Sequence, residues 1–138
     1  MLSCGGATRP LPGLVKGRVS VVGPCASGKS ELVDRLRAQG YDAHHCAQEH
    51  SQVPDMWRRL SRPEALVYLD ASLEVIRRRR PADCDEGYLQ EQRGRLAHAR
   101  EHCHIYVATD ALSPGDVLGL VLVELHRLGI ASCISRFA

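Results

Sequence analysis

Eight consecutive residues, from Gly23 to Ser30, carry the clearest chemistry in this sequence. They read GPCASGKS and fit the pattern G-x-x-x-x-G-K-[ST], in which a glycine-containing loop wraps around phosphate groups. Gly23 and Gly28 permit close approach to an anion, because glycine adopts backbone angles that other residues avoid. Lys29 would then reach the β- and γ-phosphates of a nucleotide, and the Ser30 hydroxyl would hold Mg²⁺.

The residues on either side of this loop support the same interpretation. Residues 18–22 (RVSVV) read as a short buried strand, and residues 31–37 (ELVDRLR) read as an amphipathic helix. In a strand–loop–helix unit the loop N–H groups and the positive end of the helix dipole face the anion. The alternative is a glycine turn followed by a chance lysine. We expect the whole loop to contact the nucleotide: Gly23, Pro24, Cys25, Ala26, Ser27, Gly28, Lys29 and Ser30.

Two carboxylates are expected at the carboxyl ends of strands, where open parallel sheets bind their ligands. Glu49 follows the strand predicted at 41–47, and Asp70 follows the strand predicted at 65–69. Phosphoryl transfer needs a carboxylate to orient the nucleophile or to hold Mg²⁺. We therefore predict that both residues are catalytic and that Asp70, together with Ser30, is a metal ligand. The alternatives are an exposed loop glutamate and an aspartate that favours a helix dipole.

An unbroken run of four arginines, residues 77–80, ends the next predicted helix. The four cannot all face one partner, because they span a full helical turn. One or two could cover the transferring phosphoryl group, and Arg78 is the candidate catalytic arginine. Arg93, Arg95 and Arg100, on the helix that follows, are secondary candidates. For each of these arginines the alternative is a solvated helix face.

Histidine and cysteine residues form two further groups, at residues 44–46 (HHC) and 98–104 (HAREHCH). A zinc site needs a cleaner set of four ligands, so these are interpreted as surface histidines. Cys25 differs from them, since a thiol at a helix N-terminus is more reactive than an ordinary one. We hypothesise that oxidation or alkylation of Cys25 blocks phosphate binding.

The composition is typical of one globular domain and excludes several other classes of protein. The chain has 138 residues, of which 44% are hydrophobic and 25% charged. Its net charge of +2 gives no support for a nucleic-acid partner. The six cysteines form no C-x-x-C pair and follow no signal-like apolar segment, so we expect free thiols in a reducing cytoplasm. The longest apolar run, residues 117–123, is too short to span a membrane and is interpreted as a buried helix face.

The order of predicted elements favours an α/β fold. Strands at 18–22, 41–47, 65–69 and 105–108 alternate with helices, and Ser72 and Ser113 are expected helix N-caps. This alternation predicts a three-layer α/β/α sandwich around a mostly parallel sheet of four to five strands. Residues 1–16 are expected to be a flexible leader, 17–130 a single domain and 131–138 a C-terminal tail. The edge of so thin a sheet is a surface that a homodimer would bury.

Three segments resemble the small P-loop kinases of nucleosides and nucleotides. VVGPCASGKSELVDRL (21–36) is similar to the opening motif of that family. VYLDASLEVIRRRR (67–80) is similar to the strand and helix that lead into its lid, and IYVATDALSPGDVL (105–118) to its closing strand, acid and helix. The resemblance implies a P-loop NTPase-like fold, ATP and Mg²⁺ as cofactors, and phosphoryl transfer to a small-molecule acceptor.

A fourth segment, AQEHSQVPDMW (47–57), is similar to the region of deoxynucleoside kinases that carries their catalytic base. It implies that Glu49 is the base, that Trp57 lines the acceptor pocket and that Arg78 or a neighbour is a lid arginine. Where the family inserts a strand and helices, this chain has only about 15 residues between the second predicted strand and the third. Two functions therefore stay open: a small ATP-dependent kinase, and a nucleotide-binding regulatory or partner protein with little or no turnover. The absence of an N-K-x-D motif favours ATP over GTP.

Overall fold

A parallel sheet forms the centre of the protein, whose computed structural model describes residues 13–80 and 85–132. In these residues the sheet has four strands in the order β3-β2-β4-β5: β2 (Val15–Val22), β3 (Asp42–His45), β4 (Pro63–Asp70) and β5 (Ile105–Ala108). Each neighbouring pair runs parallel. The prediction of an α/β fold with a parallel sheet is confirmed.

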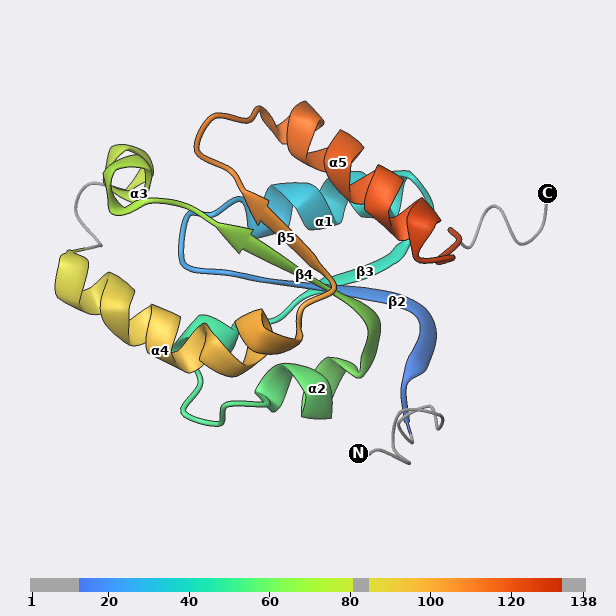
Figure 1. Ribbon diagram of the computed structural model, residues 1–138, viewed down its shortest axis with the longest axis horizontal. Coiled ribbons are helices and arrows are strands. Elements are labelled where there is room, and N and C mark those ends of the chain that lie inside the picture. The colour runs from blue at the N-terminus through green and yellow to red at the C-terminus, as the bar shows by residue number, and fades with distance from the viewer. Residues whose placement is uncertain (1–12, 81–84, 133–138) are drawn as a thin grey trace.

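Helices cover both faces of the sheet (Figure 1). One face carries α1 (Lys29–Ala38) and α5 (Pro114–Arg127), and the other carries α2 (Met56–Ser61) and α4 (Glu86–His102). The short helix α3 (Leu73–Arg79) follows β4 at the carboxyl end of the strands, and a single 3-10 turn, η2 (Gln48–His50), follows β3. The predicted order of strands and helices is therefore the observed one.

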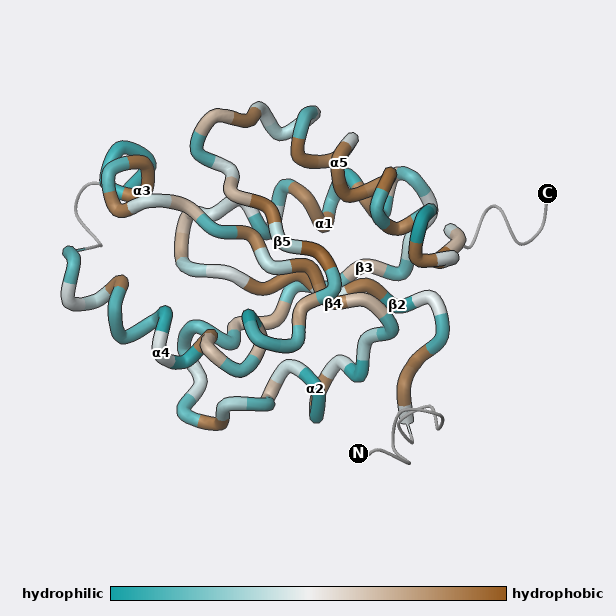
Figure 2. Tube along the Cα trace, viewed as in Figure 1, coloured by the Kyte–Doolittle hydropathy of each residue, from teal (hydrophilic) through white to brown (hydrophobic). Residues whose placement is uncertain are grey.

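The hydrophobic core is divided by strand β4, which is buried on both sides. Its odd-numbered residues, such as Val67 and Leu69, pack against α1 and α5, whereas Leu66 and Tyr68 pack against Trp57 of α2 and Leu96 of α4. A strand between two helical layers reads as a continuous apolar run, which is why PEALVYLD shows no alternation. Figure 2 shows this concentration of hydrophobic residues along the central strands.

The helices differ in which groups accept hydrogen bonds from their N-terminal N–H groups. The Ser72 hydroxyl accepts a hydrogen bond from the Val75 N–H at the start of α3, and Ser113 forms a capping box at the start of α5. Both N-cap predictions are confirmed. Helix α1 instead begins after Gly28, whose φ is 101°, and no side chain in the described residues caps it. Its first N–H groups therefore remain available to a ligand.

Several boundaries differ from those predicted. Strand β2 begins at Val15, inside the predicted leader 1–16, and residues 1–12 of that leader lie outside the described residues. Residues 81–84, and residues 133–138 of the predicted C-terminal tail, also lie outside them. Helix α4 begins at Glu86, because Asp85 caps it by accepting the Tyr88 N–H. The predicted strand 41–47 ends at His45, where the chain turns into η2.

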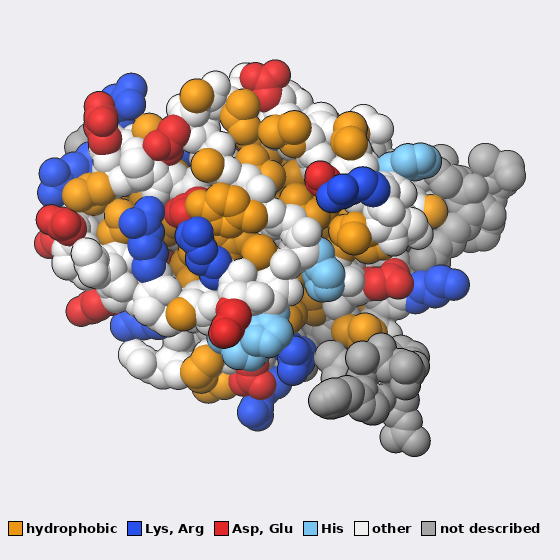
Figure 3. Space-filling view, viewed as in Figure 1, with side chains coloured by type: hydrophobic (Ala, Val, Ile, Leu, Met, Phe, Trp, Pro, Cys, Tyr) orange, Lys and Arg blue, Asp and Glu red, His pale blue; other side chains and the backbone are white. Residues whose placement is uncertain are grey.

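Helix α5 is buried on one side only. Val121 and Leu125 are fully buried, but Leu120 is 49% and Val123 66% exposed, so the run 117–123 is not the wholly buried face that we predicted. Apolar side chains accordingly reach the surface along this helix (Figure 3). No helix within the described ranges has the length and apolar character needed to cross a membrane.

Candidate functional site

The loop between β2 and α1 makes a close backbone turn that depends on its glycines. A Cβ atom on Gly23 would lie 2.2 Å from the carbonyl oxygen of Leu69 on the neighbouring strand β4, so no other residue fits without moving backbone. Gly28 adopts a left-handed conformation at the point where α1 begins. Both glycines of the motif are therefore required by geometry, and the loop can wrap closely around a ligand.

Three other elements hold this loop in place. The buried amide of Gln92 on α4 accepts the Cys25 N–H at 2.9 Å and donates to the Cys25 sulfur at 3.1 Å. Arg79 at the end of α3 donates to the Ala26 carbonyl at 2.6 Å. The Thr109 hydroxyl, after β5, lies 3.0 Å from the Asp70 carbonyl and 3.4 Å from that of Ser27. The loop is thus pre-organised by contacts from α3, α4 and β5.

Lys29 and Glu49 form a buried ion pair beside the loop. The Lys29 ammonium lies 2.7 Å from Glu49 Oε2 and also donates to the Gly23 and Pro24 carbonyls at 2.7 and 3.1 Å. The two side chains are only 11% and 5% exposed. Glu49 Oε1 is buried and has no hydrogen-bond partner in the described residues. A buried carboxylate oxygen without a partner is costly, so this atom is available for a proton, a donor or a cation.

The position of Glu49 is set by the fully buried side chain of Gln48. Its amide donates to the Val53 and Arg95 carbonyls at 2.8 and 3.2 Å and accepts the Trp57 N–H at 2.9 Å. Arg95 also donates to the Glu49 carbonyl at 3.3 Å. Gln48 therefore ties η2 to α2 and α4, and Glu49 is directed towards the loop by neighbours that are distant in sequence.

Two cavities lie on either side of the loop. One, of about 360 Å³, is lined by Lys29, Ser30, Glu49 and His50 among others. The second, of about 460 Å³, is largely apolar and has the following side chains among its lining: Leu32, Leu69, Leu112, Pro114 and Val117. Gly28, Glu31 and Arg80 line both, so the cavities meet at the N-terminus of α1.

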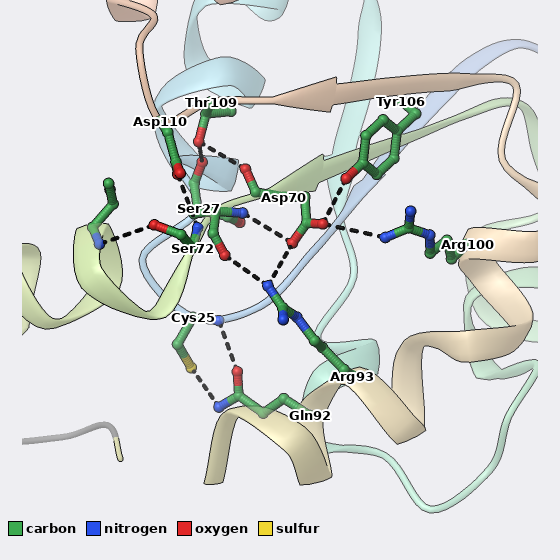
Figure 4. A network of polar contacts seen from close by, with 12 residues as sticks. Cys25, Ser27, Asp70, Ser72, Gln92, Arg93, Arg100, Tyr106, Thr109 and Asp110 are labelled. Carbon is green, nitrogen blue, oxygen red and sulfur yellow. Dashed lines mark hydrogen bonds and ion pairs between the residues drawn. The ribbon is translucent and has the colours of Figure 1, made fainter. Parts of the chain in front are cut away.

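Asp70 ends β4 as predicted, but it lines neither cavity, and its carboxylate points towards Arg93, Arg100 and Tyr106 (Figure 4). Oδ1 accepts from the Ala71 N–H at 2.9 Å and from Arg93 at 3.3 Å. Oδ2 accepts from Arg100 at 3.2 Å and from the Tyr106 hydroxyl at 2.6 Å. The structure does not bring Asp70 together with Ser30, and two arginines already neutralise its charge. This carboxylate holds α4 against β4 and β5.

The aromatic residues around Asp70 stay protonated. Burial, with the charge of Asp70 adding to it, raises the pKa of Tyr68 to about 12. Burial and the hydrogen bond to Asp70 also raise the pKa of Tyr106. Its hydroxyl therefore remains a donor to Asp70 over the ordinary pH range. The Arg100 guanidinium lies 4.6 Å from the centre of the Tyr106 ring, so its charge is shared between the carboxylate and the ring.

The arginine run contributes through members other than Arg78. Arg78 points outward, and its guanidinium lies 3.8 Å from the exposed Glu74 carboxylate one turn earlier. Arg79 instead bonds to the loop, and Arg80 lines both cavities. Helical rotation of about 100° per residue explains the difference, since adjacent side chains point in different directions. Sequence alone does not determine which of the four faces the site.

Trp57, predicted to line an acceptor pocket, is a buried residue of α2 that packs against the sheet and α4. Its indole N–H donates to His98 Nδ1 at 3.1 Å, and the His98 and His102 rings stack at 4.2 Å. Neither cavity at the loop is lined by Trp57. Figure 3 shows histidine side chains at the surface near the end of α4.

Gln92 and Thr109 were missed by sequence reasoning. A glutamine in a polar helix and a threonine after a strand give no local signal of their contacts with the loop. The one available hint for Thr109 is its place at the carboxyl end of β5, where ligand-binding groups gather.

Comparison with protein-family models and with curated protein sequences found no match to this chain.

Proposed function

We propose that this protein is a small P-loop kinase, which binds ATP with Mg²⁺ and transfers the γ-phosphoryl group to a small-molecule acceptor. The observation that carries this proposal is the buried Lys29–Glu49 pair beside the uncapped N-terminus of α1. Phosphoryl transfer needs a cation for the phosphates and a carboxylate for the nucleophile within one site. Here the two charges lie 2.7 Å apart.

The phosphate groups of ATP would occupy the smaller cavity. Loop N–H groups and the helix dipole favour an anion there. Lys29 would exchange its present acceptors, Glu49 and the two loop carbonyls, for phosphate oxygens. Ser30 lines the same cavity and supplies a hydroxyl suited to Mg²⁺, with Glu49 as a nearby carboxylate. Asp70 has no part in this proposal, because its carboxylate is already paired with Arg93 and Arg100.

The nucleoside part of ATP would occupy the larger cavity. Its apolar lining from α1, β4 and α5 suits a flat, poorly hydrated base. Since Gly28, Glu31 and Arg80 line both cavities, one molecule can extend from the base site to the phosphate site. Arg79 and Arg80 lie at the junction, where they would balance the phosphate charge.

Glu49 is the residue best placed to accept the proton of an acceptor hydroxyl. Once Lys29 turns to the phosphates, Glu49 loses its ion-pair partner and becomes a base at the edge of the phosphate cavity. His45, Ala47 and His50 line the same side, and an acceptor would bind against them. The Lys29–Glu49 ion pair therefore couples nucleotide binding to catalysis, because Glu49 becomes free to act as a base only when Lys29 binds the phosphates.

A second candidate function, nucleotide binding without turnover, is favoured by the short connection between η2 and β4. Residues 51–62 contain only the six-residue helix α2, and its one tryptophan is buried in the core. A dedicated acceptor-binding module has little room in that connection. In this case ATP would act as a ligand that alters binding to a partner.

The two functions are separated by calorimetry of ATP·Mg²⁺ binding and by turnover with a panel of small acceptors. Lys29→Ala is expected to abolish detectable binding. Glu49→Gln should retain binding but lower kcat by about 10²-fold or more, as expected when a proton-accepting group is lost. Glu101→Gln, which changes an exposed carboxylate on α4 outside both cavities, is the matched control and should leave both within a few-fold.

Circular dichroism of each variant verifies that it is folded. ATP binding that no acceptor converts into turnover would favour the partner function. Unchanged ATP affinity in Lys29→Ala would overturn both functions, since each requires the phosphate-binding loop.

A further inference from the structure

Three potential metal ligands converge at the mouth of the phosphate-binding loop. Cys25 Sγ, a Glu49 carboxylate oxygen and a His50 ring nitrogen all lie within 4.8 Å of one another. Cys25 belongs to the loop, whereas Glu49 and His50 belong to η2, so this group forms only in the folded chain. It is distinct from the histidine and cysteine groups at 44–46 and 98–104 that the sequence displays.

The distance between the sulfur and the nitrogen is that of a tetrahedral zinc site. With Zn–S of about 2.3 Å and Zn–N of about 2.0–2.1 Å, tetrahedral angles place sulfur and nitrogen about 3.5 Å apart. Cys25 Sγ and His50 Nε2 are 3.6 Å apart. His50 Nε2 also lies 3.9 Å from Glu49 Oε2, the oxygen that accepts from Lys29, so the imidazole is close to the carboxylate whose other oxygen, Oε1, would bind the ion.

The buried Glu49 Oε1 is an independent indication of a ligand. This oxygen has no hydrogen-bond partner in the described part of the chain, although the side chain is 5% exposed. Oε2 already accepts from Lys29, so a cation would bind Oε1 while the ion pair persists. A buried carboxylate oxygen without a partner, on a residue that lines a polar cavity, is the feature that a metal ion would satisfy.

Neighbouring residues orient two of the three ligands. The Gln92 amide N–H donates to Cys25 Sγ, and the Arg95 guanidinium donates to the Glu49 carbonyl. Hydrogen bonds to the residues that bind a metal fix the orientation of those residues and raise the affinity for the metal. Thiolate, imidazole and carboxylate together favour Zn²⁺ over Mg²⁺ or Ca²⁺, which prefer oxygen ligands alone.

We propose that Cys25, Glu49 and His50 form a Zn²⁺ site with a fourth position open to the cavity. Binding releases the thiol proton of Cys25 to solvent as the Zn–S bond forms, without any change of oxidation state. The site shares Glu49 and the loop with the proposed kinase function, but the proposal does not rest on that function, because none of its geometry depends on a nucleotide. Three protein ligands and one open position would leave room for water or a small anion.

Cobalt(II) substitution tests the proposal in the full-length chain, because a thiolate bound to Co²⁺ gives a near-ultraviolet charge-transfer band. We expect this band with the wild type, its displacement by Zn²⁺, and its loss in Cys25→Ser. Cys103→Ser is the matched control, since Cys103 is also a free, partly buried thiol, and it should retain the band. Persistence of the band in Cys25→Ser would overturn the proposal.

Zn²⁺ competition with a chromophoric chelator measures the other two ligands. His50→Asn should weaken Zn²⁺ binding by about 10-fold or more, whereas His44→Asn, outside the group, should not. Lys29→Ala removes a competing cation from Glu49 and should strengthen Zn²⁺ binding, although it would abolish ATP binding. Equal Zn²⁺ affinity in the wild type and His50→Asn would contradict the site. Lys29→Ala is expected to strengthen Zn²⁺ binding and to abolish ATP binding. Measuring both affinities in this variant therefore distinguishes failure of the metal site from failure of the nucleotide site.

Discussion

Asp70 shows how the partners of a single residue determine its role. From sequence it is an acid at the end of a buried strand, which is the usual place of a Mg²⁺ ligand. In the folded chain its two oxygens accept from Arg93, Arg100 and Tyr106, all on α4 or β5. In this arrangement the carboxylate joins these elements, and its role as a metal ligand stays a prediction.

Replacing Asp70 by Asn distinguishes a structural role from a metal-binding one. We expect a loss of about 1–3 kcal/mol in the free energy of unfolding, because charged hydrogen bonds to two arginines are weakened. ATP affinity and its Mg²⁺ dependence should stay within a few-fold of wild type. Urea unfolding and calorimetry at several Mg²⁺ concentrations measure the two effects, with the exposed Asp34→Asn as control. Loss of Mg²⁺ dependence at unchanged stability would restore the metal-ligand prediction.

Substitution of glycine by alanine is expected to have opposite effects on stability at Gly23 and at Gly119. Gly23→Ala places a methyl group against the Leu69 carbonyl and should destabilise the protein by about 1–3 kcal/mol. Gly119→Ala, in the middle of α5 with open space around it, should stabilise by about 0.5–1 kcal/mol, since alanine loses less backbone entropy in a helix. Thermal unfolding measures both. A neutral Gly23→Ala would show that the close approach to β4 is absent.

At the scale of elements, α5 combines a buried face with an exposed apolar one. Val121 and Leu125 pack on the sheet, while Leu120, Val123 and Leu128 face outward. The repeated apolar residues of VLGLVLVEL gave no sign of which side faces the sheet, because nearly all positions are hydrophobic. The packing of α1 and β5 against this helix decides it.

Two leucines on α5 test this assignment. Leu125→Ala should lower the free energy of unfolding by about 2–5 kcal/mol through loss of buried contacts and the cavity left behind. Leu120→Ala, with the same change at a half-exposed position, should cost less than about 1 kcal/mol. Urea titration measures both. Equal costs would mean that α5 is rotated or covered on its outer face.

At the scale of the whole molecule, the contact of Trp57 with His98 joins α2 to α4 on one face of the sheet. His98 Nδ1 accepts the indole N–H, so that nitrogen must be unprotonated. Burial lowers the pKa of His98, and the positive charges of His102 and Arg58 lower it further. Protonation of His98 therefore opposes this contact.

This arrangement predicts a fall in stability on the acid side. The unfolded chain takes up the His98 proton near its ordinary pKa of about 6.5, at a higher pH than the folded chain does. The free energy of unfolding should therefore decrease as pH falls from about 7, until His98 is protonated in the folded state too. Trp57, the single tryptophan, provides a fluorescence signal for this titration. His98→Asn should remove the fluorescence midpoint below about pH 6.5, whereas His126→Asn should not; a midpoint unchanged in both would contradict the assignment.

The sequence by itself determined the order of strands and helices, the two serine caps and the glycine loop. These are local properties: short apolar runs, residues that cap helices, and glycines that permit unusual backbone angles. It also indicated Lys29 and Glu49 as site residues, since each follows directly from a strand end or a motif.

The tertiary structure decided which side chains meet. It paired Lys29 with Glu49, turned Asp70 towards Arg93 and Arg100, and brought Gln92 to Cys25 across the fold. It also brought Cys25 within 3.6 Å of His50. These contacts join residues far apart in the chain, and a hydrogen bond or ion pair depends on distances of a few tenths of an ångström. Only the packing of helices on the sheet sets such distances, so no local pattern could predict them.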